Sequence, residues 1–289
     1  MLQASDAFSR SESLPTIIPT KGMVLTYLDY ANISRVYFKE KILITKEFLE
    51  DICFISQHDH ARVSLDLFLL LNEDLTQGLE NSEELKYAIR NHDSGWIEYD
   101  KIPKTNKEGQ VYTFQNMKTS LQEELWIKSI SNSMFPYSSL LISEHFKILN
   151  SKSQRASSNS NSFTSSVDKV VKLNFGGEEI PSKDTKKFNV ELGFLQITDL
   201  LSLILCRERL VSYDLIPSIK SLNDNMFNIE LDKIGESVYK FPSGIFKAKE
   251  NLIEIPYKML SQELLLTPKK LKEEYRNSRV KYRQLALVC

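Results

Sequence analysis

The feature that most constrains the fold of this chain is one aspartate inside a long apolar helical segment. Residues 188–211 predict a long helix, and Asp199 shares one face of it with apolar residues at helical spacing, namely Leu192, Leu195, Leu203 and Cys206. Burying a carboxylate without a partner raises its pKa or destabilises the fold by several kcal/mol. Other segments must therefore bring a compensating group to Asp199.

Histidine is a residue type suited to that role, and the chain has four. His60, His92 and His145 each lie on a segment that predicts a helix, with apolar neighbours three or four residues away. All three are thus expected to face the core. One divalent metal would satisfy them together with Asp93 and Asp199, because it compensates carboxylates and binds neutral imidazole nitrogens.

The fourth histidine, His58, is less well placed. Two residues before His60 on a helix, it points roughly 200° away, so the two are not expected to bind one ion as a helical pair. It falls in the first turn, where the geometry is loose, and it stays a candidate ligand. A single histidine on an apolar stripe is more often a core residue bonded to a carbonyl. Only the convergence of several favours a metal.

Local signals predict helices in the middle of the chain and strands at both ends. Residues 24–55 and the pieces after Pro217 are β-prone. A charged helix opened by Thr267-Pro268 is predicted to close the chain. Other helix starts are predicted at Ser56 (with Asp59), Asn81 (with Glu84), Ser120 (with Glu123) and Pro136.

The 289 residues, 42% hydrophobic and 26% charged, fit one globular domain. Residues 1–22 lack the apolar run of a secretory signal and predict a disordered tail, and 23–289 predict a single domain. Residues 151–170 begin with a Ser-rich run and predict a flexible insertion within it.

The net charge and the cysteines indicate which partners and which cellular compartment to expect. A net charge of -1 provides no field that favours nucleic acid, and the apolar stretches are too short or too polar to span a membrane. The three cysteines are widely separated and form no disulfide or zinc pattern, which fits a cytoplasmic protein. We find no Gly-rich nucleotide loop and no Gly-x-Ser-x-Gly elbow.

The order of the candidate ligands, His60, then His92-Asp93, then Asp199, resembles the H…HD…D signature of the HD superfamily. That family folds as a helical bundle whose ligands bind one or two divalent metals, and most members are phosphohydrolases or phosphodiesterases. His145 stands where two-metal members supply extra histidines. The resemblance implies a mainly α fold, an HD-domain-like helical bundle with small β elements from the N- and C-terminal parts.

More closely, a pattern DHA…HDxGW…SxH…DLLSL between about residues 50 and 260 is similar to a bacterial family known only as a domain of unknown function. Its most specific part is "NHDSGW". Two features depart from common HD phosphohydrolases. Trp96 replaces the usual lysine, and a single histidine lies between the HD pair and Asp199. A complete second metal site would need His58, Glu144 or water.

The resemblance implies a metal-dependent hydrolase that acts on a phosphate ester, nucleotide-like, through metal-activated water. His60, His92, Asp93 and Asp199 would hold the first ion, with Asp93 bridging to any second one. His145 would bind a second ion or a phosphate oxygen, so Asp93 and His145 are the catalytic candidates. The candidate substrate contacts are Arg62, Arg90 and Trp96, although exposed helix arginines and a buried tryptophan are the commoner explanations.

Two alternatives stay open at this point. The same ligands suit manganese, iron, nickel or zinc, so the protein is also a candidate HD-type di-iron oxygenase. A non-catalytic metal-binding or regulatory module is the other, with the basic helix near the C-terminus as its contact surface. The expected partner of an enzyme is a small-molecule substrate, and the sequence leaves the oligomeric state open.

Overall fold

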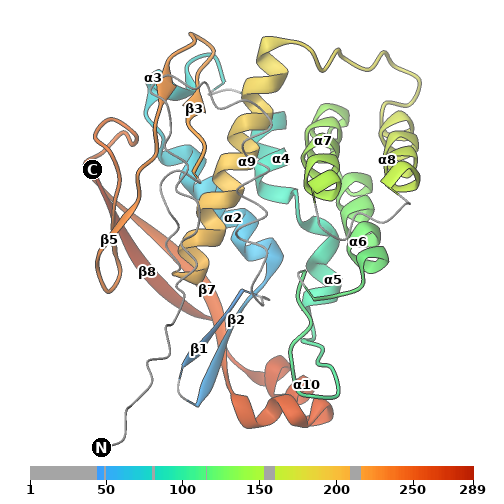
Figure 1. Ribbon diagram of the computed structural model, residues 1–289, viewed down its shortest axis with the longest axis vertical. Helices are drawn as coiled ribbons and strands as arrows, with labels where there is room; N and C mark the ends of the chain where they lie inside the picture. Colours follow the sequence, from blue (N-terminus) through green and yellow to red (C-terminus); the bar gives the residue numbers. More distant parts are fainter. Residues whose placement is uncertain (1–43, 49, 80–81, 115, 153–159, 209–215) are drawn as a thin grey trace, which may run out of the picture.

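The computed structural model describes residues 44–48, 50–79, 82–114, 116–152, 160–208 and 216–289. These residues form a mixed α/β structure with a twisted sheet on one side and stacked helices on the other (Figure 1). The predicted tail at 1–22 and much of the predicted strand region at 24–55 lie outside the described residues.

The main sheet has six strands drawn from both ends of the chain. In spatial order they are β1 (Ile44–Phe48), β2 (Asp51–Ile55), β7 (Glu250–Ser261), β8 (Lys281–Val288), β6 (Val238–Lys240) and β5 (Asp232–Gly235). Among the described strands of this sheet, β6 and β8 pair in parallel and the other neighbours are antiparallel. The long strand β7 pairs with β8 along its first part and with β2 along its last part. It thereby connects the N-terminal and C-terminal parts of the described chain. A separate pair consists of β3 (Ile219–Lys220) and β4 (Met226–Phe227).

The helices pack in layers from the sheet outward. Their bounds are α2 (Gln57–Leu70), α3 (Glu73–Thr76), α4 (Glu83–Asn91), α5 (Ile97–Asp100), α6 (Thr119–Ser131), α7 (Pro136–Lys152), α8 (Ser160–Asn174), α9 (Lys186–Arg207) and α10 (Pro268–Asn277), with 3₁₀ helices η1 (Ser94–Trp96) and η3 (Gln262–Leu266). Helix α2 contacts both β7 and α9, and α4 contacts α2, α7 and α9. Helix α8 packs on α6 and α7 at the outside (Figure 1). The centre of the molecule is therefore the junction of α2, α4, α7 and α9.

The prediction of a mainly α, HD-domain-like bundle with small β elements is wrong, because the fold is mixed α/β. The main cause is the C-terminal segment. The predicted charged helix does begin at Pro268, but it ends at Asn277. Residues Lys281–Val288 then form β8, which lies between β7 and β6 inside the sheet. Tertiary pairing decides the conformation of these residues, and local propensity does not reveal it.

Two of the predicted helix starts are confirmed. Ser56 caps α2, and its side chain accepts a hydrogen bond from the Asp59 N–H at 3.0 Å. Helix α7 begins at Pro136. Both starts depend on strong local chemistry: a side-chain acceptor for an otherwise unpaired N–H, and a residue with no N–H to leave unpaired.

Two other helix starts are wrong in position. Helix α6 begins at Thr119, one residue before the predicted cap, and its N-cap position is Lys118. Helix α4 is capped by Ser82, which accepts from the Leu85 N–H at 3.3 Å. The predicted cap of α4, Asn81, lies outside the described residues.

The predicted flexible insertion at 151–170 is wrong where the structure describes it. Helix α7 continues through Lys152, and α8 starts at Ser160; residues 153–159 lie outside the described residues. Within α8, Phe163 and Val167 are buried, and the Phe163 ring packs against Trp126 with centroids 5.9 Å apart. Two apolar residues one helical turn apart dock this serine-rich segment onto the core despite its composition.

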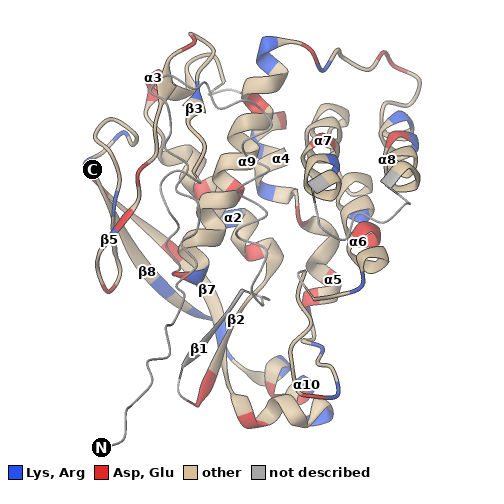
Figure 2. Cartoon of the chain, viewed as in Figure 1, with Lys and Arg blue, Asp and Glu red and all other residues tan. Residues whose placement is uncertain are grey.

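Helix α9 is the central helix of the fold. By length and composition alone it is apolar enough to cross a membrane, but 83% of its apolar window is buried inside the protein. Its apolar side chains are thus buried against the helices and strands around it. The charged residues are mixed in sign along the rest of the chain, as on α10 (Figure 2), in agreement with the net charge of -1.

Candidate metal centre

Four helices bring histidine and aspartate side chains to one buried place. Helix α2 supplies His60, the end of α4 supplies His92 and Asp93, α7 supplies His145 and α9 supplies Asp199. None of the five is more than 6% exposed. The rings of His60 and His92 lie 5.2 Å apart between centroids, and those of His92 and His145 lie 5.7 Å apart. The structure therefore gathers residues that are scattered along the sequence.

The distances among these side chains suit one ion. His60 Nε2 lies 2.8 Å from Asp93 Oδ2, and His92 Nε2 lies 3.4 Å from Asp199 Oδ1 and 3.7 Å from Asp93 Oδ2. Potential ligand atoms of His60, His92 and Asp93 all lie within 4.8 Å of one another. With bonds of about 2.1 Å, neighbouring ligand atoms of a metal lie about 3.0–3.4 Å apart, which is close to this spacing.

The Asp199 carboxylate faces two groups of ligands. Its Oδ1 lies 3.4 Å from His92 Nε2 and 3.7 Å from His60 Nδ1, while its Oδ2 lies 3.4 Å from His145 Nε2. Asp199 thus stands between the first set of ligands and His145. The sequence hypothesis gave the position between two ions to Asp93, and that role stays a prediction.

Hydrogen bonds behind the ligands fix the orientation of two imidazole rings. His92 Nδ1 donates to Ile89 O at 2.9 Å, which turns Nε2 toward the centre. Ser202 Oγ donates to Asp199 O at 2.8 Å, so it accepts from His60 Nδ1, also at 2.8 Å. Each ring therefore uses Nδ1 as its donor. His92 presents Nε2 to Asp93 and Asp199, and His60 presents Nε2 to Asp93, the arrangement that a metal-binding histidine needs.

Three buried ring nitrogens in this centre have no hydrogen-bond partner in the part of the chain that the structure describes. They are His92 Nε2 and both nitrogens of His145. Buried polar atoms are nearly always hydrogen-bonded in native proteins, so each of these needs an explanation. A cation next to Asp199 would accept both Nε2 lone pairs, and the residues present therefore fit a divalent metal.

The electrostatics of the centre also favour a cation. Burial lowers the pKa of His92, but the nearby carboxylates of Asp93 and Asp199 outweigh it and raise that pKa to about 9. Burial raises the pKa of Asp199, yet His145 and His92 hold it well below its usual range. The buried carboxylates thus draw positive charge to this place, which protons or a metal ion can supply.

His58 and Arg90 lie beside the centre and contact each other. Arg90 NH1 lies 3.1 Å from His58 Nε2, and it donates to His58 O at 3.3 Å. Burial and the Arg90 charge lower the pKa of His58, so the ring is neutral at neutral pH. The ring faces a guanidinium. The set of ligand atoms mutually within 4.8 Å comprises His60, His92 and Asp93, so it omits His58 and also Asp199 and His145.

Arg62, Trp96 and Glu144 make contacts with other parts of the fold. Arg62 donates to Glu254 O at 2.8 Å and so ties α2 to β7. Trp96 is 2% exposed and packs edge-to-face against Tyr99, within a small apolar cluster. Glu144, considered for a second site, pairs with Lys147 and Lys183, each at 2.8 Å.

Sequence reasoning missed two small residues that support the centre. Ser202 follows Asp199 by three residues and so lies on the same helix face, a signal that was available. Gly95 packs against α6 so closely that a Cβ there would lie 2.1 Å from Leu125 O. No pattern in the sequence identifies that contact.

A family model described as "Protein of unknown function (DUF3891)" matches residues 43–262, a segment that contains all five residues of the centre. No curated protein and no solved structure matches the chain.

Proposed function

The chain belongs to the DUF3891 family of proteins of unknown function, and we propose that it is an HD-type metal-dependent hydrolase of phosphate esters. One observation supports this most strongly. Two buried imidazole nitrogens, His92 Nε2 and His145 Nε2, face the carboxylate of Asp199 from two other helices and have no hydrogen-bond partner among the described residues. The order of these ligands along the chain resembles the H…HD…D signature.

In this proposal His60, His92, Asp93 and Asp199 would hold the first ion. Asp199 Oδ2 and His145 offer a position for a second ion, or for a phosphate oxygen bonded to His145. When bound, manganese, iron, nickel or zinc lowers the pKa of a bound water toward about 7 and polarises a phosphoryl oxygen.

The protein's own contribution is to prepare this centre. Ser202 and Ile89 O keep the rings of His60 and His92 in the correct tautomer. The exposure of the ligands, at most 6%, keeps bulk water away from the carboxylates and strengthens their attraction to an ion. We include a small-molecule substrate, nucleotide-like, and a cytoplasmic location in the proposal.

The test is metal analysis of protein purified without chelator, followed by turnover of p-nitrophenyl phosphate, bis(p-nitrophenyl) phosphate and a nucleotide panel. His92→Ala is expected to lose the metal and at least 100-fold of any turnover, because it removes a ligand of the ion. His58→Ala is the matched control, since it removes an imidazole next to the centre but outside the cluster, and it should keep the metal.

Two results would contradict the proposal. Wild-type protein that retains no metal, and that His92→Ala does not alter, would leave only a non-catalytic module. Two irons per chain with an oxygen-sensitive absorption band would favour the di-iron oxygenase, for which the position of Asp199 between two ligand groups is also suited.

A further inference from the structure

Glu191 is a second buried carboxylate on α9, and the proposed reaction does not use it. Its side chain is 0% exposed. Its Oε1 accepts the Ser82 hydroxyl at 3.2 Å, and its Oε2 accepts the Tyr137 hydroxyl. Ser82 caps the N-terminus of α4, and Tyr137 lies in the first turn of α7. One carboxylate thus joins three helices, α4, α7 and α9.

The same three helices supply His92, His145 and Asp199 to the metal centre. Tyr137 precedes His145 by eight residues on α7, and Glu191 precedes Asp199 by eight residues on α9. On α4, the serine that bonds to Glu191 precedes the first residue, and His92 follows the last. Eight residues rise about 12 Å along a helix. The three helices therefore run in the same direction and are joined by polar side chains at two levels.

Apolar side chains fill the space between the two levels. Leu141 on α7 and Leu195 on α9 lie midway along these stretches, and both are fully buried. Apolar packing tolerates rearrangement, whereas a buried polar group can specify the register of neighbouring helices. A slip of one residue moves a helix by about 1.5 Å, and a metal site needs its ligands within about 0.5 Å of their positions. The centre thus needs a more exact register than apolar contacts provide.

We propose that Glu191 is a positioning residue of the metal centre. Its two hydrogen bonds set the register in which α4 and α7 hold His92 and His145 against Asp199. The inference rests on the proposed function where it concerns an ion. The register itself can be measured without one.

The chemistry of the Tyr137–Glu191 pair suits this role. Burial raises the pKa of the Tyr137 phenol, and the hydrogen bond to Glu191 and the charge of Glu191 raise it further. The phenol therefore keeps its proton at neutral pH and donates it to the carboxylate. Lys187 Nζ lies 3.9 Å from Glu191 Oε1 and compensates part of its charge. Sliding of α4 or α7 would break a hydrogen bond to a buried carboxylate, which is costly.

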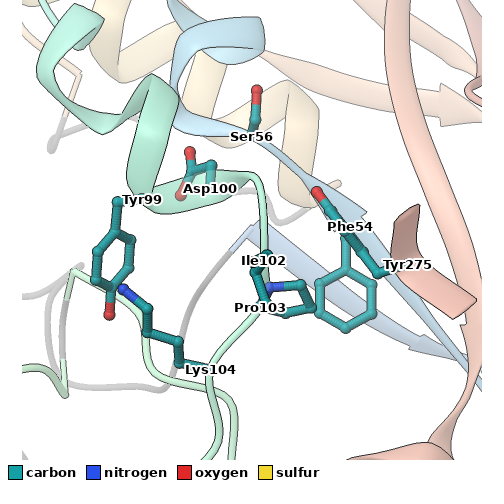
Figure 3. Close-up of a pocket in the computed structure, with 8 residues that line it drawn as sticks. All are labelled: Phe54, Ser56, Tyr99, Asp100, Ile102, Pro103, Lys104 and Tyr275. Carbon is teal, nitrogen blue, oxygen red and sulfur yellow. The ribbon is translucent and has the colours of Figure 1, made fainter. Parts of the chain in front are cut away.

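The test compares Tyr137→Phe with Tyr275→Phe by calorimetric titration of metal-free protein with zinc and with manganese. Tyr137→Phe removes one hydrogen bond of Glu191 and should weaken metal binding about tenfold or more, as the loss of groups that orient a ligand does. Tyr275 is the matched control, because it is a buried tyrosine on α10 that packs against Phe54 of β2 beside a small pocket (Figure 3). Tyr275→Phe should bind the metal as wild type does.

Two substitutions of Glu191 separate its hydrogen bonds from its charge. Glu191→Gln keeps an oxygen for the Tyr137 hydroxyl and gains an amide that can donate to Ser82 Oγ, so its affinity should stay within about threefold of wild type. Glu191→Met has a similar length and neither group, so it should lose about tenfold or more even where its melting temperature is unchanged. An equal loss in both variants would mean that the charge acts on the ion directly, and would overturn the role in register.

A second readout needs no metal. Nitrogen NMR spectra of the metal-free protein report the protonation and the surroundings of each imidazole. Tyr137→Phe should shift the signals of His145, because its Nε2 lies 3.4 Å from Asp199 Oδ2 and this separation depends on the register of α7. Tyr275→Phe should leave these signals unchanged.

The outcomes separate this inference from the proposed function. Wild-type affinity and unchanged His145 signals in Tyr137→Phe would overturn the role of Glu191 and leave the hydrolase intact. Wild-type protein that binds no metal would overturn the proposed function, and the nitrogen spectra would then decide the register alone. If Tyr137→Phe does not fold, the comparison of Glu191→Gln with Glu191→Met decides.

Discussion

Gly95 has no room for a side chain. A Cβ at this position would lie 2.1 Å from Leu125 O and 2.7 Å from Ser129 N, both backbone atoms of α6. The Gly95 N–H also donates to Ser129 Oγ at 2.9 Å. The 3₁₀ turn that follows Asp93 is thereby held on α6, and the position of the Asp93 carboxylate depends on it.

Gly95→Ala is expected to destabilise the protein by about 1–3 kcal/mol, because the added methyl group forces α6 and η1 apart. The measurement is urea unfolding of the metal-free protein. Gly193→Ala is the matched control: a Cβ there would meet nothing within 4 Å, and alanine in a helix interior should gain up to about 1 kcal/mol. Equal effects of the two substitutions would show that η1 does not pack on α6 as described.

Asp100 should make stability depend on pH. Its folded pKa is about 7, raised chiefly by burial, whereas an unfolded aspartate titrates near 3.9. Between these values the folded state binds more protons, so its stability falls as pH rises from about 4 to 7. The stability of Asp100→Asn relative to wild type should therefore rise by roughly 2–3 kcal/mol over this window, allowing for partial exposure. Denaturant midpoints at pH 4.5, 6 and 8 test this, and parallel pH curves would contradict it.

Helix α9 is both a core helix and a carrier of acidic side chains, although buried carboxylates destabilise a core unless they have partners. It fills the centre of the core, and it carries buried acidic groups at two levels, Glu191 and Asp199. Each is compensated by neighbouring helices: Tyr137 donates to Glu191, Ser82 donates to it at 3.2 Å, and His92 and His145 face Asp199. The polar side chains of α9 thereby determine which helices pack around it.

Ser202→Ala tests the support that α9 gives to the centre. It removes the acceptor for His60 Nδ1, and loss of such a group weakens metal binding about 10–100-fold. Calorimetric titration of metal-free protein with manganese or zinc measures this. Ser143→Ala, which removes another buried hydroxyl that bonds within its own helix, should leave the affinity unchanged. If both variants bind the metal as wild type does, Ser202 has no role at the ligand.

Helical periodicity was enough to place four polar side chains on inward faces, namely His60, His92, His145 and Asp199. Leu85, Ala88 and Ile89 are fully buried in α4, and His92 continues the same stripe. The role of His92 as a ligand stays a prediction. The sequence failed at β8, where "KYRQLALV" follows a charged helix without a distinct signal and takes its conformation from β7 and β6. It also failed at Gly95, because a close contact between distant segments leaves no periodic trace.

At the scale of the whole molecule, the sheet joins the two ends of the described chain. Strand β2 pairs with β7, β7 with β8, and α2 begins directly after β2. The helices that hold the candidate ligands therefore share one core with the sheet. We expect the helical layers and the sheet to unfold together.

Leu285→Ala on β8 tests whether the sheet and the helices unfold together. Leu285 is 0% exposed, and its truncation should cost about 2–5 kcal/mol, whereas Tyr282→Ala, at 58% exposure, should cost far less. Fluorescence of Trp96 and Trp126, both in the helical part, should report the same midpoint as far-ultraviolet circular dichroism in each variant. Separate midpoints would mean that the sheet and the helices are independent units.

The ring of His60 is oriented by a serine 142 residues further along the chain. During synthesis on the ribosome, His60 and His92 are therefore made long before the helix that completes their surroundings. An ion captured by the nascent chain at that stage would lack Asp199, so an ion bound as proposed would have to be loaded after α9 has docked. If the protein binds a metal there, the order of synthesis as well as affinity would set the time of uptake.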